Sequence, residues 1–430
     1  MAKKTFRMKE IATIILAGGQ GSRLFPLTMS RCKPAMCYGG RYRLIDIPIS
    51  NAINSGCQNI YVITQFLSHS LHQHIMSTYR LGSFFPGFID LLSVEEKPEK
   101  KTWLKGTADA VRQNLDHLSQ NRADYFLILS GDQLYQMDFS PMVELAIESN
   151  ADVVVASLPV SKTVADRMGI LQIDEEHFIT SFIEKPQKEG ELDKMELSPK
   201  QMERLGIKAS KKPTFLGSMG IYLFKRKALF DLLKNKLHDD FGKDIIPAKV
   251  EKGNIATYIH QGYWEDIGTI ESYYQANMAL NSVRPPLDCY DERWPIFAHE
   301  TTLPGARIFK TLIDRAIICE GSYVEAQEVS HSILGPRTYV EKDTVIRNSY
   351  IMGNDFFSSP QTAHLHSTQP CIGKGCIIDK ALIDKHVCIG DHVQLVNKHN
   401  LSHYDGDQIY IRDKIIVVPR GVTLPDGFIL

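Results

Sequence analysis

Apolar residues recur at every sixth position in the last third of the chain, and this period restricts the fold more than any other feature. The repeated positions form two runs: Leu334, Val340, Ile346, Met352 and then Ile377, Ile383, Ile389, Leu395. Neither an α-helix nor a single alternating strand has this period, which is typical of short strands stacked as coils of a parallel β-helix. A small sandwich of short strands is the alternative. Residues 355–370 interrupt the repeat and are expected to bulge from one coil.

The earlier part of the chain instead alternates short β-branched runs with longer polar-apolar segments. Strands are predicted at 11–16, 59–64, 125–132, 151–160 and 217–224, and helices at 66–79, 107–120 and 140–149. This alternation predicts an α/β domain with a Rossmann-like, mostly parallel sheet, whose ligands bind at the carboxyl ends of the strands. The Pro-rich segment 284–304 indicates a boundary, so we expect domains at 1–290 and 291–430. The charge-dense stretch 187–213 is expected to be a surface excursion.

A glycine-rich loop follows the first predicted strand. It lacks the Gly-Lys-Ser/Thr of a Walker loop, and Leu24 stands where a dinucleotide fingerprint needs its third glycine. Glycines without side chains let backbone N–H groups approach a triphosphate. Arg23 and Lys33 add a planar fork and a mobile point charge, both of which suit a polyphosphate.

Composition excludes several classes of function. The net charge of −1 argues against a nucleic-acid binder, and no apolar run approaches the ~18 residues of a membrane helix. The eight cysteines form no CxxC pair, which indicates reduced thiols of a cytoplasmic protein. His69 and His72 would share a helix face while His74 would not, so we expect polar helix surface rather than a metal site.

Several segments together resemble the sugar-1-phosphate nucleotidyltransferases, and among them the glucose-1-phosphate adenylyltransferases. They are LAGGQGSRLFPLTMSRCKPA (16–35), RLIDIPISNAINSG (43–56), WLKGTADAVRQN (103–114), SGDQLY (130–135), IEKP (183–186), SMGIYLF (218–224), DFGKDIIP (240–247) and YWEDIGTIESYYQANMAL (263–280). The resemblance implies a nucleotidyltransferase domain followed by a left-handed parallel β-helix, in an enzyme of glycogen biosynthesis. It also implies ATP and glucose 1-phosphate as substrates, Mg²⁺ as cofactor, and a homotetramer.

The resemblance also assigns roles to residues. Arg23, Lys33 and Asp132 would be catalytic, and Asp132 and Asp266 would bind Mg²⁺. The residues expected to contact the nucleotide are Leu16, Gly18, Gly19, Gly21, Gln65, Gly106 and Thr107. Those expected to contact glucose 1-phosphate are Gly169, Glu184, Lys185 and Ser218. From the residues alone, a structural role in a turn or a helix cap explains Asp132 and Asp266 as well as metal binding does. Leu104 stands where many bacterial members carry a substrate-contacting Tyr, so that contact is not expected.

The C-terminal segment resembles the plant and cyanobacterial branch, in which lysines near the C-terminus bind a phosphorylated metabolite. Lys385 matches one such lysine, and Arg420 stands where the other would be; both also fit solvated surface charges. Two rival functions stay open: transfer from UTP, dTTP or GTP, and a catalytically silent regulatory paralogue. The segments SGDQLYQMD and YWEDIGTIESYYQAN favour adenylyl transfer, and the retained loop cations, Lys185 and both aspartates argue against a silent paralogue.

Overall fold

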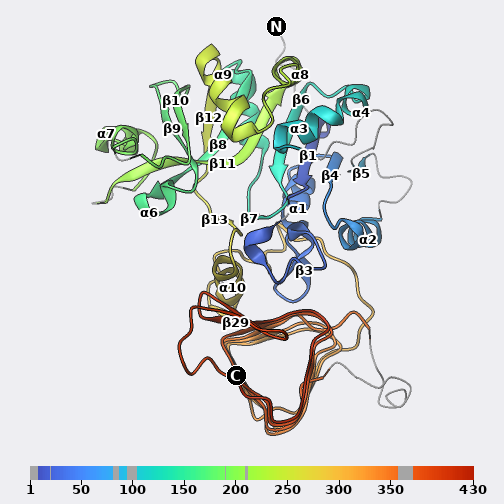
Figure 1. Cartoon of the computed structure of the whole chain (residues 1–430). Coiled ribbons are helices and arrows are strands. Elements are labelled where there is room, and N and C mark those ends of the chain that lie inside the picture. The colour runs from blue at the N-terminus through green and yellow to red at the C-terminus, as the bar shows by residue number, and fades with distance from the viewer. Residues whose placement is uncertain are drawn as a thin grey trace. The chain divides into compact units, whose positions relative to one another are not determined.

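The computed structural model describes residues 8–19, 21–80, 87–93, 104–188, 190–208, 212–356 and 371–430 (Figure 1). These residues form two compact units. Unit 1 comprises the described residues within Met1–Gly18, Ile47–Gln65 and Arg80–Trp264, and unit 2 those within Gly19–Asp46, Phe66–Tyr79 and Glu265–Leu430. The chain therefore passes between the units several times. The domain boundary at 290/291, expected from the sequence, stays a prediction.

Unit 1 is built on a nine-stranded sheet that confirms the Rossmann-like prediction. Its strands are β1 (Ile11–Ala17), β4 (Asn59–Thr64), β5 (Phe88–Ser93), β6 (Tyr125–Ser130), β8 (Val153–Ser161), β9 (Gly169–Ile173), β10 (Ile179–Glu184), β11 (Thr214–Lys225) and β12 (Ile255–Ile259). The pairs β6–β1, β1–β4, β4–β5 and β8–β12 are parallel, whereas β11 runs antiparallel to β6, β8 and β9. Because β1 is almost wholly buried, it shows a continuous apolar run instead of alternation.

The helical segments predicted at 66–79, 107–120 and 140–149 each contain at least one helix. The helices are α1 (Asp46–Asn54), α2 (His69–Thr78), α3 (Thr107–Gln113), α4 (Leu115–Gln120), α5 (Ser140–Glu148), α6 (Lys162–Ala165), α7 (Pro199–Arg204), α8 (Arg226–Leu233), α9 (Ile246–Lys252) and α10 (Ile270–Met278). The expectation of a surface excursion at 187–213 was wrong for part of the described segment. α7 begins there with a capping box from Ser198 and Gln201, and Met195 and Met202 are buried.

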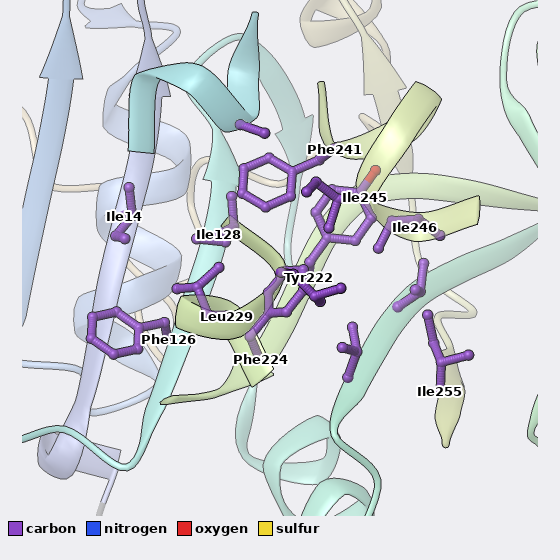
Figure 2. Close-up of a cluster of buried hydrophobic side chains, with 14 of the residues drawn as sticks. Ile14, Phe126, Ile128, Tyr222, Phe224, Leu229, Phe241, Ile245, Ile246 and Ile255 are labelled. Carbon is purple, nitrogen blue, oxygen red and sulfur yellow. The ribbon is translucent and has the colours of Figure 1, made fainter. Parts of the chain in front are cut away.

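A cluster of buried hydrophobic side chains in unit 1 contains several aromatic rings (Figure 2). Phe241 lies against Tyr222 and Phe224 of β11, with ring centroids 5.8 and 5.6 Å apart. Ile14 and Ile128, from β1 and β6, belong to the same cluster. The turn that carries Phe241 is thus packed directly on the central strands, and this packing places the residues on either side of it.

The C-terminal part of unit 2 is a parallel β-helix, seen end-on as a triangle in Figure 1. One side contains β14 (Arg307–Ile308), β17 (Tyr323–Val324), β20 (Tyr339–Val340), β25 (Cys388–Ile389) and β30 (Thr423–Leu424). A second contains β15 (Leu312–Asp314), β18 (Glu328–Ser330), β21 (Val345–Arg347), β23 (Ile377–Asp379) and β26 (Gln394–Leu395). The third contains β16 (Ile317–Ile318), β19 (Ile333–Leu334), β22 (Tyr350–Ile351), β24 (Ala381–Ile383) and β29 (Ile415–Val418).

The structure confirms the β-helix that the six-residue repeat predicted. One of the positions predicted to point inward is wrong. Leu334, Val340 and Ile346 are fully buried, as predicted, but Ile377 is 41% exposed. Ile378 takes the inward position because Ile346 pairs with Ile378 across the parallel ladder. The slip arises beyond the interruption of the repeat; residues 357–370, where a bulge was expected, lie outside the described residues.

A hairpin extends the third side of the β-helix. Its strands are β27 (His403–Asp405) and β28 (Tyr410–Arg412), and β28 pairs antiparallel with β29.

All eight cysteines lie in described segments and are free thiols. Among the helices that the structure describes, none has both the length and the apolar character needed to cross a membrane.

Candidate active site

The expected catalytic aspartate of unit 1 lies where two parallel strands end. The N–H of Gly131, just after β6, donates to the Leu16 carbonyl near the end of β1 over 3.0 Å. Asp132 follows immediately, and its carboxylate accepts a hydrogen bond from the Ser130 hydroxyl. A carboxylate and a hydroxyl at this edge provide the oxygen donors that Mg²⁺ prefers.

Gly18 and Gln65, two residues predicted to bind the nucleotide, lie together at the same edge of the sheet. A Cβ on Gly18 would lie 3.5 Å from Gln65 Cβ and 3.8 Å from Leu104 Cδ1. Gln65 directly follows β4, the neighbour of β1 in the sheet. The strand ends therefore bring Leu16, Gly18 and Gln65 together. Leu104 adds an apolar side chain to this group.

Gly106 and Thr107 are tied to the segment before the Phe241 turn. A Cβ on Gly106 would lie 2.4 Å from the Asp239 carbonyl oxygen, so only glycine permits this approach. The Thr107 hydroxyl donates to Asp240 Oδ2 and accepts from the Phe241 N–H, each over 3.0 Å. These contacts fix the entry of α3 against the turn that follows Asp240.

The predicted sugar-binding carboxylate sits between two glycines. Glu184 ends β10 and pairs with Gly169 of β9. Built Cβ atoms on Gly169 and Gly242 would lie 2.8 and 3.0 Å from Glu184 Oε2. Larger residues at either position would push the carboxylate away, so these two glycines define where it lies.

Lys185 follows with a strained backbone. Its φ is 48°, in the left-handed region that non-glycine residues rarely occupy, and its N–H donates to the Met168 carbonyl over 3.0 Å. The Nζ atom lies 3.3 Å from Glu184 Oε1, and the side chain is 54% exposed. Such strain is concentrated at functional sites, where surrounding structure holds it. The pair presents an ammonium and a carboxylate side by side at the end of β10.

Ser218 lies close to this pair on β11. Gly217 of β11 pairs with Ile170 of β9, which places Ser218 beside Gly169. The Ser218 hydroxyl is hydrogen-bonded to buried Tyr222; burial raises the pKa of Tyr222, and the nearby charges of Glu184 and Asp240 raise it further. The structure thus brings together all four residues predicted to bind glucose 1-phosphate.

Sequence reasoning missed two residues that shape this group. Asp240 caps the turn Phe241–Ile245, accepting from the Lys243 N–H over 3.0 Å, and Gly242 closes on Glu184. Both residues lie in the segment DFGKDIIP, which carries part of the family resemblance. The glycine two positions after Asp240 is the sequence signal that could have identified them.

In unit 2, the remainder of the glycine-rich loop folds back on itself. Gly21 has a φ of 63°, and a Cβ there would lie 3.1 Å from Thr28 Cγ2 and 3.2 Å from Lys33 Cβ. The Thr28 hydroxyl donates to the Gly21 carbonyl over 3.1 Å. Glycine at position 21 therefore permits both the turn and the return of Lys33 to it, while Gly19 is exposed.

Arg23 and Lys33 converge on Asp266. Lys33 Nζ lies 3.6 Å from Asp266 Oδ1. A Cβ built on Gly268 would lie 3.5 Å from Arg23 Nη2 and 3.4 Å from Asp266 Oδ2, so both side chains border this glycine. Two cations and one carboxylate near the same glycine form an arrangement suited to a polyphosphate with its cation.

His74 corrects the expectation of polar helix surface. It is buried, and its Nε2 lies 2.6 Å from Asp46 Oδ1, which also accepts from the Tyr79 hydroxyl over 2.8 Å. This histidine is a structural partner of the carboxylate at the start of α1. Within the described ranges, no cluster of three or more His, Cys, Asp or Glu side chains could hold a metal ion.

Lys385 and Arg420, the expected effector residues, meet at one carboxylate. Arg420 Nη2 lies 3.0 Å from Asp355 Oδ2, Lys385 forms an ion pair with Oδ1, and His386 Nε2 lies 2.9 Å from Oδ2. Burial raises the pKa of Asp355, but the bonds and charges of His386 and Lys385 outweigh this and hold it below its usual range. Two permanent cations therefore share the single negative charge of Asp355.

Comparison with protein families covers most of the chain. Residues 12–283 match the family model described as Nucleotidyl transferase. Residues 301–429 match the model described as GLGC left-handed parallel beta-helix domain. The two matches correspond to the α/β portion and to the β-helix.

Proposed function

Because the chain belongs to the nucleotidyl transferase family and ends in a GLGC-type left-handed β-helix, we propose that it transfers an adenylyl group from ATP to glucose 1-phosphate. The coarser class, a sugar-1-phosphate nucleotidyltransferase, follows from the two family matches. In the proposed reaction, a phosphate oxygen of glucose 1-phosphate attacks the α-phosphorus of ATP. The bond to the β-phosphate breaks, and pyrophosphate leaves with its electron pair.

The convergence of Arg23, Lys33 and Asp266 carries this proposal. A sugar phosphate is already largely a dianion at neutral pH, so the attacking oxygen needs no general base. The protein must instead hold two polyanions in line and offset their charge. Arg23 and Lys33 supply positive charge for the triphosphate. Glu184 and Lys185 are placed to orient a glucose hydroxyl and the sugar phosphate, respectively.

Asp132 and Asp266 are the residues that would hold Mg²⁺. Carboxylates fit this ion because it takes one or two of them together with phosphate oxygens and water. The Ser130 hydroxyl bonded to Asp132 would keep that carboxylate oriented. When bound, the ion offsets negative charge on the polyphosphate.

We further propose regulation by a phosphorylated metabolite at Lys385 and Arg420. The supporting observation is that these cations and His386 gather at Asp355, leaving positive charge uncompensated. A homotetramer is proposed from the resemblance and from the exposed Leu312 and Ile313 on the β-helix. A cytoplasmic enzyme of glycogen biosynthesis is the corresponding cellular role.

The deciding experiment measures pyrophosphate release from ATP, UTP, GTP and dTTP, each with glucose 1-phosphate and Mg²⁺. Galactose 1-phosphate and mannose 1-phosphate serve as matched sugar controls. We expect ATP with glucose 1-phosphate to have the highest kcat/KM. Preference for another nucleotide would refute the adenylyl assignment while keeping the class. Inactivity with every pair, in a folded protein, would favour the silent paralogue.

A further inference from the structure

We propose that the β-helix positions the loop that carries Arg23 and Lys33, with Tyr410 and Asp384 as positioning residues that contact it at Phe25 and Arg31. The inference rests on the proposed function, because that function gives Arg23 and Lys33 their role at the triphosphate. All the contacts that carry it lie within unit 2.

The first anchor holds the chain just after Arg23. Phe25 directly follows the 3₁₀ helix Ser22–Leu24, and its ring is 39% exposed. It meets the Tyr410 ring edge to face, with centroids 5.3 Å apart and planes at 86°. The guanidinium carbon of Arg412 lies 5.9 Å from the Phe25 centroid and 5.5 Å from that of Tyr410. Aromatic pairs and cation–π contacts of this geometry are attractive and directional.

The hairpin that supplies these side chains is itself well held. Arg412 Nη1 donates to the carbonyls of Tyr404 and Ile411 over 3.0 and 2.9 Å, and Nη2 bonds Asp405. Tyr410 pairs with Val417 of β29, and Val417 pairs in turn with Leu382 of β24. The contact to Phe25 therefore comes from a strand continuous with the β-helix ladder.

The second anchor holds the chain just before Lys33. Arg31 is only 2% exposed, and its Nη2 donates to Asp384 Oδ1 over 2.7 Å, while Nη1 lies 3.7 Å from Met352 Sδ. Burial lowers the pKa of Arg31, but the charge of Asp384 more than offsets this and raises it overall. Asp384 directly follows β24, the strand paired with β29. Both anchors thus originate from strands of one sheet, β28 and β24, which flank β29 on either side.

The two anchored residues lie between the two proposed phosphate ligands, each two positions from one of them. Phe25 lies two positions after Arg23, and Arg31 lies two positions before Lys33. Groups that contact a reacting polyphosphate must be held to within about 0.5 Å. The glycines of the loop supply no such rigidity, because glycine restricts its backbone least. The side chains of the β-helix supply it instead.

The test compares Tyr410→Ala with two matched variants, Tyr410→Phe and Tyr404→Ala. Tyr410→Phe keeps the ring against Phe25, and Tyr404→Ala removes a ring from the same hairpin while keeping the carbonyl that Arg412 uses. These hairpin variants are preferred to Asp384→Asn because breaking one side of a buried ion pair destabilises a fold strongly. Two readouts are taken: steady-state kinetics in each substrate, and amide hydrogen exchange of residues 21–33.

We expect Tyr410→Ala to reduce kcat/KM for ATP about three- to tenfold, the effect that contacts of this kind support. Exchange across residues 21–33 should increase, because a loop that loses an anchor opens more often. KM for glucose 1-phosphate should stay unchanged. Tyr410→Phe and Tyr404→Ala should match the unaltered protein in both readouts.

Unchanged exchange and unchanged ATP kinetics in Tyr410→Ala would overturn the inference, as would an equal loss in Tyr404→Ala. Equal effects on both substrates would indicate a general structural role and would also overturn it. If the unaltered protein is inactive with every nucleotide and sugar phosphate, the proposed function fails. The exchange comparison then still decides whether Tyr410 holds the loop.

Discussion

Replacing Lys185 with alanine should weaken the use of glucose 1-phosphate far more than that of ATP. Lys185 ends a strand beside Glu184, with Nζ 3.3 Å from Oε1, and its backbone is held at a φ of 48°. Alanine keeps the Cβ and so leaves the backbone strain nearly unchanged. The substitution therefore removes the ammonium and the stem with little other change.

The exposure of Lys185 sets the size of the effect. Attraction between unit charges about 4 Å apart is about 1 kcal/mol in water and about 4 kcal/mol at an effective dielectric constant of 20. A lysine whose side chain is 54% exposed lies near the lower end of this range. We therefore expect a loss of about 1–2 kcal/mol, or a 5- to 30-fold rise in KM for glucose 1-phosphate. A fully desolvated lysine would give about 2–4 kcal/mol.

The assay is initial-rate pyrophosphate release, with one substrate varied and the other saturating. Lys188→Ala is the matched control, since this lysine lies three positions away, is highly exposed and pairs only loosely with Glu191 at 3.9 Å. It should leave both KM values unchanged. An equal rise in KM for ATP and glucose 1-phosphate in Lys185→Ala would refute a sugar-phosphate contact. So would a KM for glucose 1-phosphate unchanged from that of the unaltered protein.

Three further outcomes are expected. Asp132→Asn should lower kcat by at least ~10²-fold while thermal unfolding is unchanged, because it removes a charge that Mg²⁺ needs; near-normal turnover at saturating Mg²⁺ would contradict this. Gly242→Ala should raise KM for glucose 1-phosphate about three- to tenfold and spare ATP, because its Cβ would lie 3.0 Å from Glu184 Oε2 and shift that carboxylate. Replacing Lys385 and Arg420 together with alanine should abolish activation by 3-phosphoglycerate or a hexose bisphosphate while sparing unactivated turnover; calorimetry should show the loss of a coupling of about 1–3 kcal/mol, and retained activation would reject the site.

Local patterns were enough to predict the architecture of both parts of the chain. The β-branched runs predicted β1, β4, β6 and β11, and the six-residue repeat predicted the β-helix, because both signals are set by side chains close together along the chain. The roles given to Glu184, Lys185 and Ser218 came from a resemblance, and the strand pairings of unit 1 bring these residues together. The sequence motifs specify which residue types occur and in what order along the chain, but not which of them are in contact.

The tertiary structure decided the contacts between residues far apart in the chain. Arg31 meets Asp384, and Phe25 meets Tyr410, across more than 350 intervening positions. His74 is buried on Asp46 although its helix looks polar in the sequence. Such contacts depend on the register of the β-helix coils, and one register change moved the inward position from Ile377 to Ile378. A local pattern cannot specify register across a gap, because the energy that sets it comes from packing between coils.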